Sequence, residues 1–159
     1  MNFHNHMPDE AILFFSVFSR AEFALKRGGF CQGAVGGKAE PNWDIFANAL
    51  GQAFFDAMQA APEVHVLFVE PPRVLKVDAQ GGVYFEDQAA ATNAAGLFVA
   101  VRRVRNNLFH GEKANFTQRD QMLVRAGLHV LEAALARCGE GHLRRVGTAF
   151  AYADLNQNP

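Results

Sequence analysis

Four stretches of this 159-residue chain carry apolar residues at the spacing of one face of an α-helix. Glycine or proline interrupts the pattern between them, so each stretch predicts a separate helix. Helices joined by short links pack antiparallel, and the chain is long enough to bury one core. We therefore expect an all-α fold, an antiparallel bundle of four to five helices, in a single domain over residues 1–159. The expected helices span residues 8–27, 42–60, 88–110 and 118–138, with a short fifth helix within residues 142–155.

The ends of these stretches carry residues that usually cap helices. Pro8 suits the first turn of the first helix, and Gly28 suits its end. Asn42 can cap the second helix, because its side-chain oxygen can accept a hydrogen bond from a backbone N–H that has no partner within the helix. Thr117 with Asp120 resembles a capping box for the fourth helix. Local signals thus agree with the periodicity on where these helices begin.

Phenylalanine dominates the expected core. The sequence contains 15 phenylalanines, and many of them fall at helical spacing, so we interpret them as core residues of a helical protein. Two of the expected core-facing sets are Phe14, Phe18, Ala21 and Leu25 in the first helix, and Ile45, Ala49, Ala53 and Phe54 in the second.

The two longest links differ in character. Residues 31–41, CQGAVGGKAEP, contain GGK, but Gln32 stands where a phosphate-binding loop needs glycine, and Ala39 stands where it needs serine or threonine. We expect a flexible connection there. Residues 63–87 contain VHVLFV, which is rich in β-forming residues, followed by RVLKV and VYFE on either side of DAQGG. They predict a small hairpin-like insertion between the second and third helices.

Charge and cysteine content argue against several broad classes. The formal net charge is −1, so nothing global attracts nucleic acid or a membrane, and any affinity for anions must be local. Cys31 and Cys138 lie far apart in the sequence, and no cysteines or histidines show the spacing of metal ligands. We therefore expect no metal site, no cofactor and no disulfide scaffold. The longest apolar run is too short for a bilayer, and the first residues carry acids rather than a basic leader. We expect a cytoplasmic protein without a membrane partner.

The stretch VRRVRNNLFHGEK, residues 101–113, concentrates hydrogen-bond donors near the end of the third helix. At 100° per residue, Arg103, Asn106 and His110 cluster opposite the core-facing stripe, with Asn107 beside them. These side chains should face solvent or a partner. The stripe itself consists of Leu97, Val101, Val104 and Leu108.

Arg105 occupies the border of that stripe. A long cationic side chain there buries its stem and needs an acceptor for its head group. Glu22 lies on the same face of the first helix as Phe15 and Phe18, where a carboxylate is costly unless it is paired. We therefore expect Glu22 and Arg105 to be partners if the two helices pack together.

A purely structural explanation of residues 101–113 is open. Cations and a histidine near a helix C-terminus stabilise its macrodipole, and asparagine and glycine often end helices. Two features argue against it. Asn106 and Asn107 weaken a helix in mid-turn, and three arginines exceed what a cap needs. The repulsion among the arginines favours binding of an anion.

Residues 105–110, R-N-N-L-F-H, resemble the R-x4-6-H signature of the HEPN superfamily (higher eukaryotes and prokaryotes nucleotide-binding). A polar residue such as Asn106 often follows the motif arginine in that family. The wider string VRRVRNNLFHGEK looks like a standalone bacterial HEPN group, and FSRAEFALKRGGF, residues 18–30, is similar to the first-helix segment of that group. The resemblance thus covers two separated helices and agrees with a helical bundle.

The resemblance implies a metal-independent endoribonuclease. HEPN ribonucleases are homodimers in which the two motifs form one composite cleft, and the RNA 2′-hydroxyl attacks the adjacent phosphorus to leave a 2′,3′-cyclic phosphate. Arg105 would hold the scissile phosphate, His110 would transfer a proton or position the reacting oxygens, and Asn106 would orient either of them. Glu22 would be auxiliary. The side chains expected to contact RNA are Arg102, Arg103, Asn107 and Lys113.

A second subunit also answers a geometric problem. Arg105 and His110 lie about 140° apart on an ideal helix, so they cannot converge on one atom from a straight helix of one chain. A homodimer would supply the missing half of the site.

Three functions follow as hypotheses. The first is an RNase that acts on tRNA or mRNA, as a toxin or defence effector, and a toxin predicts an inhibitory antitoxin such as a nucleotidyltransferase-like protein. The second is a non-catalytic HEPN-type dimer that binds a nucleotide, RNA or a partner protein. The third is a structural dimer in which residues 101–113 only end a helix. The combination of Arg105, Asn106 and His110 favours the first, because a scaffold does not need all three.

Overall fold

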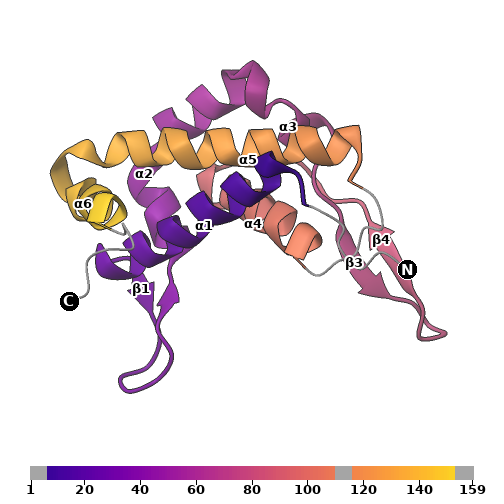
Figure 1. Cartoon of the computed structure of the whole chain (residues 1–159), viewed down its shortest axis with the longest axis horizontal. Coiled ribbons are helices and arrows are strands. Elements are labelled where there is room, and N and C mark those ends of the chain that lie inside the picture. Colours follow the sequence, from indigo (N-terminus) through magenta and orange to yellow (C-terminus); the bar gives the residue numbers. More distant parts are fainter. Residues whose placement is uncertain (1–6, 110–115, 153–159) are drawn as a thin grey trace.

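The computed structural model describes residues 7–109 and 116–152, and within them the chain is mostly helical (Figure 1). The expected all-α class is therefore confirmed in outline, although two small antiparallel sheets accompany the helices. No helix in this part of the chain is both long and apolar enough to cross a membrane. The α-helices are α1 (Asp9–Arg27), α2 (Trp43–Ala60), α3 (Val66–Val69), α4 (Ala94–Phe109), α5 (Gln118–Ala136) and α6 (Arg144–Tyr152). The 3-10 helices are η1 (Pro62–Val64), η2 (Arg137–Gly139) and η3 (Gly141–Leu143), and the strands are β1 (Cys31–Gln32), β2 (Glu40–Pro41), β3 (Val74–Val77) and β4 (Val83–Glu86).

Most expected helix ends are confirmed. The Asn42 side-chain oxygen accepts a hydrogen bond from the backbone N–H of Ile45 (3.1 Å) and caps α2. The capping box of α5 is complete, because Thr117 and Asp120 each bond the backbone N–H of the other. The beginning of α4 was predicted wrongly. It starts at Ala94 rather than residue 88, because Asn93 Oδ1 accepts the N–H of Gly96 (2.8 Å) and so caps the helix there.

The expected core face of α1 is confirmed, whereas that of α2 is wrong in part. Ile45 is 56% exposed and Ala53 is also exposed. At 100° per residue Ile45 lies opposite the stripe of Trp43, Leu50 and Phe54, so the expected face was misplaced on the helix. Gly51 (φ 79°, ψ −176°) also interrupts the helix and divides it into two halves. Each half buries its own set of side chains, namely Trp43, Phe46, Ala47 and Leu50 before the kink, and Phe54, Phe55 and Met58 after it.

Aromatic rings fill the centre of the helical body. Trp43 stacks on Phe98 of α4 with ring centroids 5.3 Å apart, and Phe54 stacks on the same ring at 6.0 Å. Phe18 of α1 reaches Trp43 at 5.4 Å. Such pairs add about 0.5–1.5 kcal/mol each beyond the burial of area. The aromatic core thus packs α1, α2 and α4 against one another and holds α4 in position.

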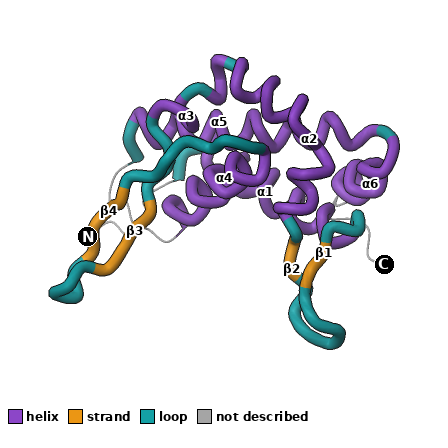
Figure 2. The backbone as a smooth tube through the Cα atoms, turned by 180° about the vertical axis from the view of Figure 1, so that it is seen from behind, coloured by secondary structure: helices purple, strands orange, loops and turns teal. Residues whose placement is uncertain are grey.

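Two hairpins project from the helical body (Figures 1 and 2). The β1–β2 hairpin was not predicted, since residues 31–41 were expected to form a flexible connection. The β3–β4 hairpin was predicted from the residues around DAQGG and is confirmed. The β-rich string VHVLFV is helical instead, in η1 and α3, because Val64, Val66 and Leu67 are buried where these short helices pack against α5.

Candidate functional site

Arg105 of α4 lies against α1 and has three neighbours there and on its own helix. Its Nη2 atom is 3.6 Å from Glu22 Oε1, and its Nη1 atom donates a hydrogen bond to Asn106 Oδ1 (2.9 Å). Its guanidinium carbon lies 4.9 Å from the centroid of the Phe18 ring. The expected pairing of Glu22 with Arg105 is therefore confirmed, and Arg105 takes the border position that the helical spacing predicted.

These contacts orient the guanidinium but do not engage all of its N–H donors among the described residues. The Arg105 and Glu22 side chains are 30% and 28% exposed, so solvent screens their attraction only in part. The Phe18 ring adds roughly 0.5–1 kcal/mol of cation–π attraction. A guanidinium has five N–H donors, and within the described residues only one of those of Arg105 is engaged in a hydrogen bond. The remaining N–H groups can donate hydrogen bonds to the oxygens of an anion.

Arg102 and Asn106 extend this donor set along α4. Arg102 precedes Arg105 by three residues and Asn106 by four, so the three side chains are neighbours on the helix surface. Arg102 and Asn106 are exposed, and Arg102 makes no ion pair with any described residue. The Asn106 oxygen is bonded to Arg105, which leaves its amide N–H groups to donate outward. We call Glu22, Arg102, Arg105 and Asn106 the arginine site.

Asn107 and Arg103 lie elsewhere on α4. Asn107 was expected to contact RNA beside Asn106, but it is half-buried and its amide donates a hydrogen bond to the backbone carbonyl of Arg73 (2.9 Å). One residue of helical rotation turns it from the arginine site to the β3–β4 hairpin. Arg103 precedes it by one turn and is half-buried. The sequence could not reveal this contact, because Arg73 lies far away along the chain.

His110 and Lys113, the other expected members of the site, lie outside the described residues. The last described residue of α4 is Phe109, so His110 directly follows the helix in the chain.

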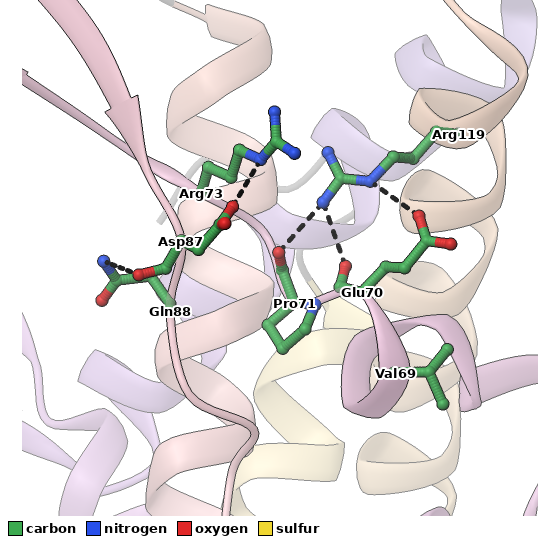
Figure 3. Close-up of a pocket in the computed structure, with 7 residues that line it drawn as sticks. All are labelled: Val69, Glu70, Pro71, Arg73, Asp87, Gln88 and Arg119. Carbon is green, nitrogen blue, oxygen red and sulfur yellow. Dashed lines mark hydrogen bonds and ion pairs between the residues drawn. The ribbon is translucent and has the colours of Figure 1, made fainter.

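A second polar cluster joins the β3–β4 hairpin to the helical body (Figure 3). Arg119, at the start of α5, donates to Glu70 Oε2 (3.2 Å) and to the backbone carbonyls of Glu70 (3.1 Å) and Pro71 (3.0 Å). Arg73 pairs with Asp87 across the base of the hairpin (2.8 Å). These residues border an open pocket of about 420 Å³. Sequence reasoning missed Arg119, although a cation in the first turn of a helix is unfavourable and so signals an external partner.

The cysteines and histidines do not form a metal site within the described residues, because no three His, Cys, Asp or Glu side chains gather there. His65 is exposed and His129 is half-buried. Cys31 is exposed, whereas Cys138 is buried and its Sγ donates to the carbonyl of Ala134 (3.3 Å). Burial raises the pKa of the Cys138 thiol to about 11, so it stays protonated near neutral pH.

No protein-family model matches the chain, and no curated protein or solved structure matches it at a significant level. The likeness to HEPN ribonucleases therefore rests on two segments of the sequence, residues 18–30 and 101–113.

Proposed function

We propose that the chain is a metal-independent endoribonuclease of the HEPN type that works as a homodimer. The observation that carries this proposal is the arrangement around Arg105. Its guanidinium is oriented by Glu22 and Phe18 and has N–H groups that bond no other described residue. It stands five residues before His110 in the same motif. A helix cap needs none of this orientation. A phosphate-binding arginine needs all of it, because a donor held in place pays no reorganisation cost as charge develops.

The proposed chemistry breaks one phosphodiester bond. The RNA 2′-oxygen attacks the adjacent phosphorus, the bond to the 5′-oxygen of the next nucleotide breaks, and the products end in a 2′,3′-cyclic phosphate and a 5′-hydroxyl. His110 takes up or delivers the proton that moves between these two oxygens. Arg105 donates to the non-bridging oxygens, whose negative charge grows as the fifth bond to phosphorus forms. Asn106 donates from the position beside Arg105, and Arg102 attracts the flanking backbone electrostatically.

Glu22 has a positioning role in this proposal. Its carboxylate fixes where the guanidinium points and offsets part of the repulsion among Arg102, Arg103 and Arg105. Among the described residues the arginine site holds two guanidinium groups, of Arg102 and Arg105, against the one carboxylate of Glu22, so this part of α4 favours anions although the whole chain has a net charge of −1.

The homodimer follows from the rotation between the two motif residues. Since Arg105 and His110 are about 140° apart on a straight helix, a second copy would complete the site. The exposed side of α1 next to the Glu22 face offers apolar surface for such a copy, because Ile12 and Phe23 are 53% and 39% exposed.

Binding without cleavage is the second candidate. The observation that favours it is the hydrogen bond between Arg105 and Asn106, since an arginine and an amide that already bond each other can grip a phosphate without moving a proton. This candidate predicts affinity for RNA or a nucleotide and unchanged substrate after long incubation.

The test uses two synthetic oligonucleotides of the same sequence in EDTA. One is RNA, and the other carries 2′-O-methyl groups throughout. We expect cleavage of the RNA alone, with 2′,3′-cyclic phosphate ends on the products. Binding of both strands without cleavage would favour the second candidate, and cleavage of the methylated strand would exclude the proposed chemistry.

A further inference from the structure

The β3–β4 hairpin has one wholly apolar face. Its strands pair antiparallel with Leu75 opposite Phe85 and Val77 opposite Val83. Side chains alternate between the two faces of a strand, so these four apolar residues share one face. The opposite face carries Val74, Lys76, Tyr84 and Glu86, and it is polar at its centre, where Lys76 pairs with Glu86 (2.9 Å). We call residues 73–87 the arm.

The outer half of the apolar face of the arm is exposed, whereas in its inner half Leu75 is half-buried and Phe85 lines a small pocket with Leu123 of α5. Val77 is 72% exposed, Val83 is 64% exposed and Phe85 is 36% exposed. The arm projects beyond the helices, so no element among residues 7–109 and 116–152 covers its outer half (Figures 1 and 2). An isolated two-stranded hairpin is only marginally stable in water, and an exposed row of valines is unfavourable there. The pattern therefore indicates a surface that is covered in the working assembly.

The base of the arm is fastened to the helical body at several points. Asn107 of α4 holds the carbonyl of Arg73, and Arg119 of α5 holds the carbonyls of Glu70 and Pro71 just before it. The Arg73–Asp87 pair closes the base itself (Figure 3). The arm is thus presented in a fixed direction, which lowers the entropic cost of docking.

The charges of the arm do not suit RNA. Its two cations, Arg73 and Lys76, are each paired with a carboxylate, and Asp78 adds a further negative charge. None of the four residues on the apolar face can bind a phosphate. The chemistry of this face thus matches an apolar protein surface better than it matches RNA.

A matching apolar surface lies on α1 of the same chain. Ile12, Ser16, Ser19 and Phe23 fall within about 60° of one another around the helix, and all four are exposed. Ile12 and Phe23 are large, and the two serines between them are small, so the row has room for side chains of a partner. The exposed Leu13 borders it.

We propose that the arm packs its apolar face on the α1 row of a second copy of this chain. Four residues are far too few for a stable contact, since a standard interface buries about 800 Å² per partner. A two-fold axis makes the contact twice and covers both exposed surfaces of each chain with one arrangement. It also encloses the surface between the two arms.

This exchange deepens the proposed function and rests on its homodimer. The arm is held by Asn107, two residues beyond Arg105 on α4, and the α1 row adjoins Glu22. An arm that lies along α1 of the partner therefore brings the end of its own α4 toward the arginine site of that partner. The composite cleft needs this approach of the two α4 ends.

The first test measures the dimer by sedimentation equilibrium. The variant Val77→Lys with Val83→Glu places an ion pair at directly opposed positions, so the hairpin keeps a favourable cross-strand contact while its apolar face is lost. We expect the dissociation constant of the dimer to rise at least tenfold. The control, Lys76→Glu with Glu86→Lys, reverses the ion pair on the opposite face and should leave the dimer unchanged. The proposal would be overturned if both variants raised the dissociation constant equally, or if neither variant changed it.

The second test identifies the surface that the arm contacts. One variant carries Val77→Lys on the arm, and another carries Ile12→Glu with Phe23→Glu on α1. In a dimer of either variant alone, both arm-to-α1 contacts place a charge against an apolar surface, so each variant should be monomeric. In a 1:1 mixture, one contact pairs lysine with glutamate and the other is unaltered, so the mixture should form a dimer. Circular dichroism checks that each variant is folded. A mixture of folded variants that stays monomeric would show that the arm does not dock on α1.

The outcomes separate the arm from the enzyme. A dimer that depends on the arm but never cleaves RNA would support the exchange and remove the RNase proposal. A variant that lacks the apolar face of the arm but still dimerises and cleaves RNA would support the RNase proposal and exclude the exchange. A wild-type protein that stays monomeric at all concentrations would remove the exchange and the composite cleft together.

Discussion

The guanidinium of Arg105 lies 3.6 Å from the carboxylate of Glu22, and this ion pair joins the end of α4 to α1. Both side chains are partly exposed, and Phe18 supports the guanidinium from beneath. The pair gives α4 a cation whose direction is fixed and whose outer donors bond no other described residue. This relationship distinguishes residues 101–113 from a simple helix end.

Changes at Arg105 should remove cleavage while the fold is retained. Arg105→Lys keeps the charge and loses the planar fork of donors, so we expect cleavage to fall about 100-fold, the loss typical of one oriented donor to a developing oxyanion. Glu22→Gln leaves the guanidinium present but less well oriented, and we expect a smaller loss. Initial rates on a defined RNA give the measurement.

The matched control for these variants is another arginine–glutamate pair, which joins α5 to α1. Arg125 donates two hydrogen bonds to Glu10 (2.7 and 2.9 Å) away from the arginine site. Arg125→Gln should leave the cleavage rate unchanged. If Arg105→Lys were as active as Arg125→Gln, Arg105 would have no role beyond packing.

The two adjacent asparagines should separate activity from structure. Asn106→Ala removes a donor beside Arg105, so we expect slower cleavage and unchanged thermal stability. Asn107→Ala removes the hydrogen bond to the carbonyl of Arg73, which typically contributes about 0.5–1.5 kcal/mol, so we expect lower stability of the hairpin base. Thermal melts and hydrogen exchange of residues 73–87 measure the second effect. Identical behaviour of the two variants would contradict the division of α4 into two polar sides.

Local signals predicted much of the fold because they act over a few residues. The capping box of Thr117 and Asp120 lies within one turn, and so does the cap at Asn42. The Arg105–Glu22 pair was also predictable, since each residue is a charged group at the border of an apolar helix face. Charges in such places need partners, and few partners were available.

Most errors arose where distant contacts decided the outcome. The core face of α2 is an exception, because Ile45 stands opposite the stripe of Trp43, Leu50 and Phe54 that helical spacing alone defines. VHVLFV has strand propensity, but burial of Val64, Val66 and Leu67 outweighs that propensity. Asn107 was assigned to the wrong side because the position of the β3–β4 hairpin depends on packing across the molecule.

Gly127 of α5 should not tolerate alanine. A Cβ atom there would lie 2.8 Å from Cε2 of Phe14, a fully buried ring on α1. Alanine gains about 1 kcal/mol of helix propensity, but displacing the Phe14 ring costs about 1–3 kcal/mol, so we expect a lower free energy of unfolding. Gly139→Ala is the control, because a Cβ there meets no atom within 4 Å. Urea unfolding of both variants provides the comparison, and a stabilised Gly127→Ala variant would show that α1 and α5 are packed more loosely.

The Glu10–Arg125 pair should make stability depend on acid pH. Hydrogen bonds from Arg125 and Gln121 hold the pKa of Glu10 below its ordinary value of 4.5. A carboxyl whose pKa is lowered in the folded state stabilises that state above its unfolded pKa, and the contribution is lost as pH falls through the lowered value. Arg125→Gln should therefore be less stable than wild type at neutral pH, and the difference should shrink below about pH 4.5. A difference that grew on acidification would have the wrong sign for this pair.

The central claim is that residues 105–110 form a ribonuclease motif, and the most direct measurement compares wild type with His110→Ala on a mixed panel of tRNA and mRNA in EDTA. We expect that wild type alone cleaves the RNA and leaves cyclic-phosphate ends. No cleavage by a folded wild-type dimer would contradict the catalytic claim and favour binding without chemistry. Equal cleavage by both proteins would show that the activity does not come from this site.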